Sequence, residues 1–275
     1  MPELPEVEVV KLGLAPLITD RVIQEIYFSG KNLRLPIPRK KLEQLVKNHQ
    51  IKNIRRRAKY LLIEMTNQAT LIIHLGMSGK LGLFPVGSPQ AIHDHLRFRL
   101  DNDMEMRYND TRRFGLVQVM SKEEFKEKNP FAHLGPEPFS TDFTADYLKK
   151  MAGQRIQPIK NFLMDSKMVV GIGNIYANEI LFYSRIHPTM PIGSMTRPMW
   201  KNIVHYTPLI LRRAIEQGGS TIADFVNSSG EQGYFQLELM VYGRDNEPCK
   251  LCYNTIKKIV IGGRTTFFCP GCQGN

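Results

Sequence analysis

The chain has 275 residues, of which 42% are hydrophobic and 23% charged, a balance typical of globular proteins. Its 37 Lys and Arg against 26 Asp and Glu give a formal net charge of +11. This excess favours a polyanionic partner, usually nucleic acid, although a basic protein without such a partner has the same composition. The acidic start, MPELPEVEVV, does not fit a signal peptide, and no apolar run reaches the roughly 18 residues of a membrane span. We therefore expect a cytoplasmic protein with no membrane partner.

The first half of the chain is predicted to be mainly β-structure. A helix is expected to open it, from about Pro5 to Leu14, with Val7, Val10 and Leu14 on one face. Short runs of aliphatic and aromatic residues, separated by polar or turn-forming stretches, then indicate a sandwich or barrel. A second helix is expected over 39–48, and strands over 60–65, 70–75, 95–100 and 115–120.

The composition changes at residues 133–140, HLGPEPFS, where two prolines and a glycine predict a linker. Helical patterns dominate beyond it. The first predicted helix, 141–151, has a candidate N-cap at Thr141 or Asp142. Further helices are predicted over 155–166, 174–183 and 196–217.

The tail carries all four cysteines as two C-x2-C pairs, Cys249 with Cys252 and Cys269 with Cys272. Sixteen residues separate the pairs, a spacing typical of zinc sites. Four thiolates complete a closed tetrahedral shell that leaves no position for a reactive water. We therefore predict one structural Zn²⁺; the alternative is reduced cysteines without metal.

Three stretches have residues suited to phosphate contact, and each has a plainer alternative. The segment between the cysteine pairs predicts two strands around Gly262 and Gly263, from which Lys257, Lys258 and Arg264 project to phosphate or to solvent. The basic stretch 51–60, IKNIRRRAKY, fits phosphate binding or a solvated edge strand. The stretch VVGIGNIYANEIL places two glycines before a helix N-terminus, which fits an anion site or an ordinary turn.

Several motifs recur in a characteristic order along the chain. They are PELPEVE, RRRAKYL, HLGMSGKL, NDTRRFG, LGPEPF, VVGIGNIYANE, VYGR and GGRTTFFCPGCQ. In this order the chain resembles the formamidopyrimidine-DNA glycosylase family, bacterial enzymes that repair 8-oxoguanine. The resemblance runs from residue 2 to the last zinc knuckle.

The resemblance implies an α+β multidomain fold. An N-terminal catalytic β-sandwich with flanking helices is expected over 1–134, a helix–two-turns–helix DNA-binding domain over 135–242, and a four-cysteine zinc-finger β-hairpin over 243–275. It also implies a monomer that acts in base excision repair on double-stranded DNA containing oxidised purines or abasic sites. Such an enzyme is both a DNA glycosylase and an AP lyase.

The resemblance also assigns the chemistry of base release. Removal of Met1 exposes the secondary amine of Pro2, which attacks C1′ of the damaged nucleotide and forms a Schiff base. An α-amine has a pKa near 8, so part of it is unprotonated at neutral pH. Glu3 matches the family's acid/base residue, and Glu6 is expected to orient or tune the amine.

Two basic residues are assigned to strand cleavage. Lys59 matches the family lysine of the β-elimination step and of phosphate binding, and Arg264 matches the residue of the δ-elimination step. Because arginine stays protonated, we expect Arg264 to clamp phosphate and stabilise charge rather than to donate a proton.

A base inside a duplex has to be flipped out before it reacts. Met77, Arg112 and Phe114 match the family residues that fill the vacated space, although Met77 and Phe114 alone would be taken for core residues. A metal pair at the HDH sequence around His93 is not expected, and the loop 228–234, SSGEQGY, is expected to close over the flipped base. Further expected DNA contacts are His74, His93, Arg155, Lys160, Asn174, Tyr242 and Lys258.

Three alternative functions compete with this interpretation. Endonuclease VIII, a sibling glycosylase that removes oxidised pyrimidines, uses the same nucleophile. A zinc-containing DNA-binding protein without catalysis explains the charge and the cysteines, but not Pro2 and Glu3 occurring with Lys59 and Arg264. A basic structural protein does not explain the ordered motifs.

Overall fold

The computed structural model describes residues 2–218 and 239–274. They form two compact units, residues 2–132, and residues 133–217 together with 239–274. The finer division predicted at 134/135 and 242/243 stays a prediction. Within the described part of the chain, no helix is both long and apolar enough to cross a bilayer.

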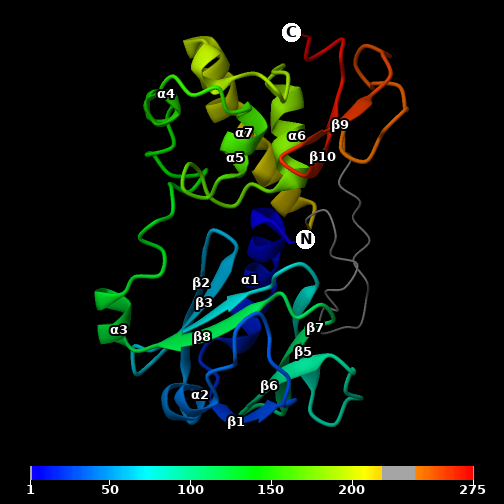
Figure 1. The fold of residues 1–275 in the computed structure, drawn as a ribbon. Coiled ribbons are helices and arrows are strands. Elements are labelled where there is room, and N and C mark those ends of the chain that lie inside the picture. The colour runs from blue at the N-terminus through cyan, green and yellow to red at the C-terminus, as the bar shows by residue number, and fades with distance from the viewer. Residues whose placement is uncertain (1, 219–238, 275) are drawn as a thin grey trace. The chain divides into compact units, whose positions relative to one another are not determined.

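The first unit is a sandwich of two antiparallel four-stranded sheets (Figure 1). The four predicted strands are β3, β4, β6 and β8, each within one residue of its expected bounds. One sheet has the order β1(Ile23–Phe28), β6(Asp94–Leu100), β7(Met104–Asp110), β5(Gly79–Pro85). The other has the order β2(Ile51–Arg57), β3(Tyr60–Met65), β4(Thr70–His74), β8(Leu116–Met120).

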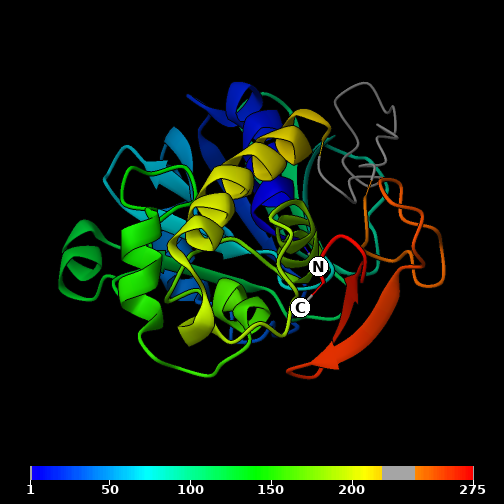
Figure 2. The same cartoon turned by 90° about the horizontal axis from the view of Figure 1, so that it is seen from above.

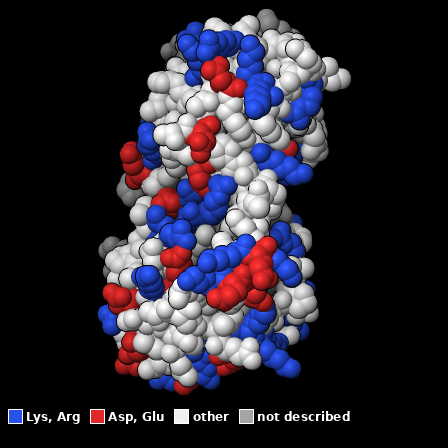
Figure 3. Space-filling model, turned by 90° about the vertical axis from the view of Figure 1, so that its left-hand side faces the viewer, with Lys and Arg blue, Asp and Glu red and all other residues white. Residues whose placement is uncertain are grey.

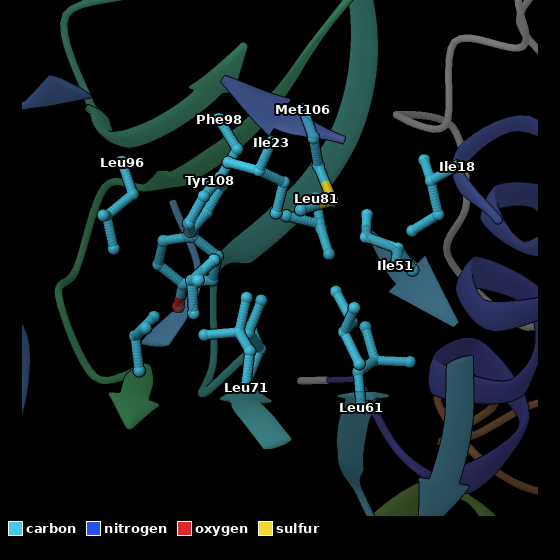
Figure 4. Packing of buried hydrophobic residues seen from close by; sticks show 14 of the residues in the cluster. Ile18, Ile23, Ile51, Leu61, Leu71, Leu81, Leu96, Phe98, Met106 and Tyr108 are labelled. Atoms are coloured by element: carbon cyan, nitrogen blue, oxygen red, sulfur yellow. The ribbon is translucent and has the colours of Figure 1, made fainter. Parts of the chain in front are cut away.

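The two sheets share one hydrophobic core. Figure 4 shows Leu61 and Leu71 of one sheet pointing toward Leu81 and Met106 of the other. The helix α1(Leu4–Ile18) adds its apolar face to the same cluster. It runs beyond its predicted end because that face continues to Ile18, which is fully buried.

Two shorter helices flank the sandwich. The helix α2(Arg39–Leu45) ends before its predicted limit, and Asn48 there adopts a left-handed φ of 60°. The helix α3(Lys122–Glu127) was not predicted, and Ser121 starts it with a capping box to Glu124.

The second unit combines helices with the C-terminal hairpin. The long helix α7(Arg197–Glu216) packs against α4(Ala145–Ala152) and α6(Asn174–Tyr183) (Figure 2). A short helix, α5(Ile159–Met164), and a 3-10 turn, η1(Ile192–Ser194), complete the helical part. The predicted hairpin is present as β9(Lys257–Ile261) and β10(Arg264–Phe268), joined at the two glycines.

Two predicted helix starts were wrong. The N-cap of α4 is Thr144, whose hydroxyl accepts the backbone N–H of Tyr147 at 3.1 Å, and not Thr141 or Asp142. The next helix starts after Pro158 rather than at residue 155, because a proline disfavours helical geometry in the residue before it.

Candidate functional site

The N-terminal end of α1 is built from two buried carboxyl groups. Glu3 is the N-cap and is 1% exposed, and Glu6 is 3% exposed. They form a capping box in which the Glu6 carboxylate accepts the backbone N–H of Glu3 at 2.8 Å. These bonds and the helix dipole fix both carboxyl groups at the start of the helix. Pro2 is therefore followed directly by a carboxyl group of fixed position.

Lys59 lies in the two-residue turn between β2 and β3. Arg56 connects this turn to α1. Its Nε donates to Glu8 of α1 at 2.6 Å, and its Nη1 donates to the carbonyl of Ala58 at 2.9 Å. The peptide that precedes Lys59 is thereby fixed to the helix that begins at the N-terminus.

Two arginines of the basic stretch 51–60 form ion pairs within the first unit. Its strand, β2, is at the edge of its sheet. Arg56 pairs with Glu8, and Arg55 pairs with Glu64 on β3. Lys and Arg side chains lie among acidic ones on the face drawn in Figure 3. The edge-strand alternative therefore holds for part of the stretch, and phosphate contact by Lys59 stays a prediction.

Two loops of the first unit, residues 75–79 and 110–115, form what we call the two-loop platform. Met77 is 42% exposed and Phe114 is 45% exposed, so neither belongs to the core. The guanidinium of Arg112 lies over the Phe114 ring, 5.0 Å from its centroid. Large apolar side chains on a fixed surface are suited to contact with another apolar surface, such as a stacked base.

Glycines allow the two loops to approach backbone to backbone. Gly76 has φ +65°, and a Cβ there would lie 2.5 Å from the nitrogen of Gly115. A Cβ on Gly115 would lie 1.6 Å from the Tyr108 hydroxyl and 2.9 Å from the carbonyl oxygen of His74. A side chain at Gly76 would force the loops apart, and one at Gly115 would displace Tyr108 and the end of β4.

Gly115→Ala should therefore destabilise the first unit. We expect the free energy of unfolding to fall by about 1–3 kcal/mol, the usual cost of overpacking. Urea unfolding followed by circular dichroism measures it. The matched control is Gly274→Ala, where the added carbon meets the Pro270 carbonyl at an ordinary 3.4 Å. Equal stability of Gly115→Ala and the wild type would contradict the tight packing.

His74, at the end of β4, is neutral at physiological pH. Burial, together with the nearby charges of Arg34 and Lys59, lowers the pKa of His74 from 6.5 to about 4. Its Nδ1 accepts the backbone N–H of Gly76 at 2.9 Å, so the ring proton is on Nε2. His74 therefore holds the first platform loop, and a DNA contact from it stays a prediction.

The buried His74 should make stability depend on pH. Because its folded pKa lies below its unfolded pKa, the native state binds fewer protons. The stabilisation is complete above pH 6.5 and is lost as the pH falls to about 4, an effect of at most roughly 3 kcal/mol. Urea titrations between these pH values should show a shallower decline for His74→Gln than for the wild type. Identical declines would exclude His74 as a contributor.

The HDH sequence does not form a metal pair in the described residues. His95 bonds to the Ser29 hydroxyl at 3.1 Å and to the Asp110 carbonyl at 3.0 Å. The ring of His93 lies 6.3 Å from that of His95. The cluster with metal-ligand geometry in the described chain consists of cysteines. The DNA contact expected of His93 stays a prediction.

In the second unit, α5 and α6 hold the backbone of β10. Asn174 donates to the Thr265 carbonyl at 3.0 Å, and Asn178 accepts the N–H of Phe267 at 2.7 Å. Lys160 is fully buried and donates to the Thr266 hydroxyl at 2.6 Å. Lys160 therefore helps to hold β10 in place, and its predicted DNA contact stays a prediction.

Glu179 of α6 holds the chain just before the zinc module. Its carboxylate is 2% exposed and accepts the backbone N–H groups of Met240, Val241 and Tyr242, at 2.9, 3.0 and 2.9 Å. Burial raises the pKa of Glu179, and the three backbone bonds oppose that effect. Tyr242 thus has a fixed backbone, and its ring packs edge-on against Phe267.

The remaining predicted cations of this unit lie at its surface. Arg155 is exposed and folds back on the carbonyl of Ala152 at 3.0 Å. Lys258 pairs with Asp245 at 2.5 Å. Arg264 is exposed at the start of β10 and directly follows the glycine turn. Among these three, Arg264 lies on β10, the strand to which side chains of α5 and α6 bond.

The four cysteines fit a zinc ion. Their sulfurs all lie within 4.8 Å of one another. The Sγ–Sγ distances are 3.8 Å for Cys249–Cys272, 3.3 Å for Cys252–Cys269 and 3.5 Å for Cys252–Cys272. A tetrahedral zinc with bonds of about 2.3 Å separates its sulfurs by about 3.8 Å. The tail is therefore a structural zinc site, with ligands from both ends of the hairpin.

Two groups of residues complete the comparison with the sequence. The predicted closing loop, 228–234, lies outside the described residues. Ser78, Asp110 and Glu179 were not predicted, although they lie in the motifs HLGMSGKL, NDTRRFG and VVGIGNIYANE. The type of a polar residue does not show that its partners will be backbone N–H groups. The presence of these residues in the motifs was therefore the one sign that could have identified them.

Three family models match the chain in order. They are the formamidopyrimidine-DNA glycosylase N-terminal domain at residues 1–117, the formamidopyrimidine-DNA glycosylase H2TH domain at 134–226, and a zinc finger found in FPG and IleRS at 246–274. Two similar curated proteins are named formamidopyrimidine-DNA glycosylase. That of Legionella pneumophila is 44% identical and covers 99% of this chain and 98% of its own. That of Vibrio parahaemolyticus is 45% identical and covers 99% and 100%.

Solved structures of Lactococcus lactis FPG are similar over the whole chain. A complex with Fapy-dG-containing DNA has a TM-score of 0.88 and 33% identity, and covers 99% of this chain and 100% of that one. A complex with DNA containing an oxidised pyrimidine has a TM-score of 0.89 and 32% identity, with 100% of both covered. Family models, relatives and structures agree, and this chain belongs to the formamidopyrimidine-DNA glycosylase family.

Proposed function

We propose that this protein is a DNA glycosylase and AP lyase that removes oxidised purines in base excision repair. The observation that carries the proposal is the position of Pro2, directly before the Glu3–Glu6 capping box at the start of α1. A secondary amine next to a fixed carboxyl group is suited to nucleophilic attack with proton transfer. The relatives' name and the damaged DNA in the similar structures support the substrate class.

The first chemical step releases the base. With Met1 removed, the Pro2 nitrogen forms a bond to C1′ of the flipped nucleotide while the bond from C1′ to the base breaks, and the proton that the amine loses neutralises the departing base. Glu3 supplies the proton that opens the sugar ring, which leaves a Schiff base between Pro2 and the sugar.

The second phase cleaves the strand. The Schiff base makes the C2′ proton acidic, and its loss breaks the bond to the 3′ phosphate. Lys59 is the residue assigned to this β-elimination step. In the δ-elimination that follows, Arg264 stabilises the charge that develops at the 5′ phosphate. The zinc ion holds the hairpin that carries Arg264 and takes no part in the chemistry.

The two-loop platform fills the gap left by the flipped nucleotide. Met77 and Phe114 are exposed and apolar, as a wedge between bases requires, and Arg112 has donors for the orphaned base.

We place the enzyme in the cytoplasm, acting as a monomer on chromosomal DNA. The reduced thiols of the zinc site fit that compartment.

Borohydride trapping tests the proposal. The protein, with Met1 removed and zinc bound, is incubated with a duplex that carries 8-oxoguanine opposite cytosine, then reduced and digested for mass spectrometry. We expect a cross-link at Pro2, with strand cleavage in the unreduced sample. A parallel duplex carries an oxidised pyrimidine. Trapping on that duplex alone would favour the endonuclease VIII-like alternative, and binding without trapping on either would favour a DNA-binding protein without catalysis.

A further inference from the structure

The hydroxyl of Ser78 joins the two loops of the platform. It donates to Oδ1 of Asp110 at 2.6 Å and accepts the backbone N–H of Arg112 at 3.0 Å. Ser78 is the neighbour of Met77 in one loop, and both of its partners belong to the other loop. A hydroxyl is suited to this place because it donates and accepts at once.

Asp110 anchors the second loop at both of its ends. Its side chain is fully buried, and Oδ2 accepts the N–H of Gly115 at 2.8 Å. The Tyr108 hydroxyl donates to the same oxygen at 3.4 Å. The carbonyl of Asp110 also accepts the N–H of Arg113 at 3.2 Å. One buried residue thus determines the conformation of the segment that carries Arg112 and Phe114.

We propose that Ser78 and Asp110 are positioning residues that make Met77, Arg112 and Phe114 act as one rigid wedge. This inference rests on the proposed function, in which those three side chains fill the gap in the duplex. The wedge side chains lie on separate loops, so only a connection between the loops fixes their spacing. A displacement of about 1 Å can cost about 10²-fold in rate when geometry is critical.

Two kinds of substrate should differ in how much they depend on this wedge. A lesion in a duplex leaves a gap and an orphaned base, and the wedge must fill that space. An abasic site in a single strand has no opposite base and no gap to fill, while Pro2 still reacts at C1′. Loss of the Ser78 hydroxyl should therefore impair duplex cleavage much more than single-strand cleavage.

The experiment compares these cleavage rates in Ser78→Ala, Ser78→Thr and the wild type. The control is Ser88→Ala, because Ser88 lies in a loop of the same unit and its hydrogen bonds in the described structure are made by its backbone. We expect Ser78→Ala to lower the ratio of duplex to single-strand rate about tenfold, and Ser78→Thr, which keeps the hydroxyl, to restore most of it. The control should keep the wild-type ratio.

An unchanged ratio in Ser78→Ala, an equal loss on both substrates, or a failure of threonine to restore the ratio would overturn the inference. Each of these outcomes requires a wild type that cleaves both substrates, which leaves the proposed function intact. A wild type that cleaves neither substrate overturns the proposed function and this inference together. Circular dichroism of each variant shows whether a loss reflects misfolding.

Discussion

A chain that keeps Met1 attached to Pro2 should bind damaged duplex but cleave it at least about 10³-fold more slowly than the processed chain, a barrier increase of about 4 kcal/mol. In the unprocessed chain the Pro2 nitrogen is part of an amide, and its lone pair is delocalised into the carbonyl group. It cannot form the Schiff base on which both base release and elimination depend. The measurement is single-turnover cleavage of an 8-oxoguanine duplex by both forms, with mass spectrometry of each N-terminus.

A second variant, Pro2→Gly, shows whether the free α-amine is sufficient or the proline ring is also required. Pro2→Gly keeps a free α-amine after Met1 is removed, so it should retain more activity than the blocked chain. The substitution leaves Glu3 and Glu6 unchanged, so the capping box should form and α1 should begin at the same residue. Equal cleavage by the blocked and processed chains would contradict Pro2 as the nucleophile.

Loss of zinc is the second change with a large expected effect. Cys269→Ser removes one of four ligands, and we expect the zinc content to fall from one ion per chain toward none. The module has a small core of its own, in which Cys249 and Cys269 are fully buried beside Phe182, Val241 and Ile256. Without the ion this core is too small to hold the hairpin, since structural zinc supplies on the order of 10 kcal/mol in such modules. Arg264 then loses its position, and strand cleavage should fall at least tenfold, an effect of about 1.4 kcal/mol or more on the barrier.

The control for this variant is Tyr253, which lies in the same zinc module directly after Cys252. Tyr253 is 81% exposed and has a left-handed φ of 62°, which asparagine tolerates well, so Tyr253→Asn keeps the backbone and all four thiolates. It should retain zinc and activity. Atomic absorption and single-turnover cleavage measure the two effects. Full cleavage by a zinc-free chain would show that the hairpin does not depend on the metal.

Short-range patterns predicted the fold class and half of the strands of the sandwich. The strands β3, β4, β6 and β8 follow from apolar runs bounded by turn residues, and the zinc site follows from cysteine spacing alone. The start at Thr144 was missed because Thr141, Asp142 and Thr144 can all serve as a cap, and the start after Pro158 because the effect of the proline was not taken into account.

The candidate site was less predictable from local pattern. Met77 and Phe114 look like core residues in the sequence, and only the family resemblance assigns them to the surface, where the structure places them. Lys160 is the opposite case, since a lysine that the family resemblance assigns to DNA contact is fully buried in the structure, and that contact stays a prediction. Both outcomes depend on contacts between residues far apart in the chain, such as Lys160 with Thr266, and no periodicity records those contacts.

The way α6 holds β10 has a consequence for how the hairpin can change. Asn174 and Asn178 bond to the main chain of the strand, at the Thr265 carbonyl and the Phe267 amide, and every amino acid except proline offers both groups. The exposed side chains of Arg264 and Thr265 therefore take no part in the bonds that hold the strand in place. Substitutions at these two positions can alter what the hairpin recognises without changing how it packs onto α6.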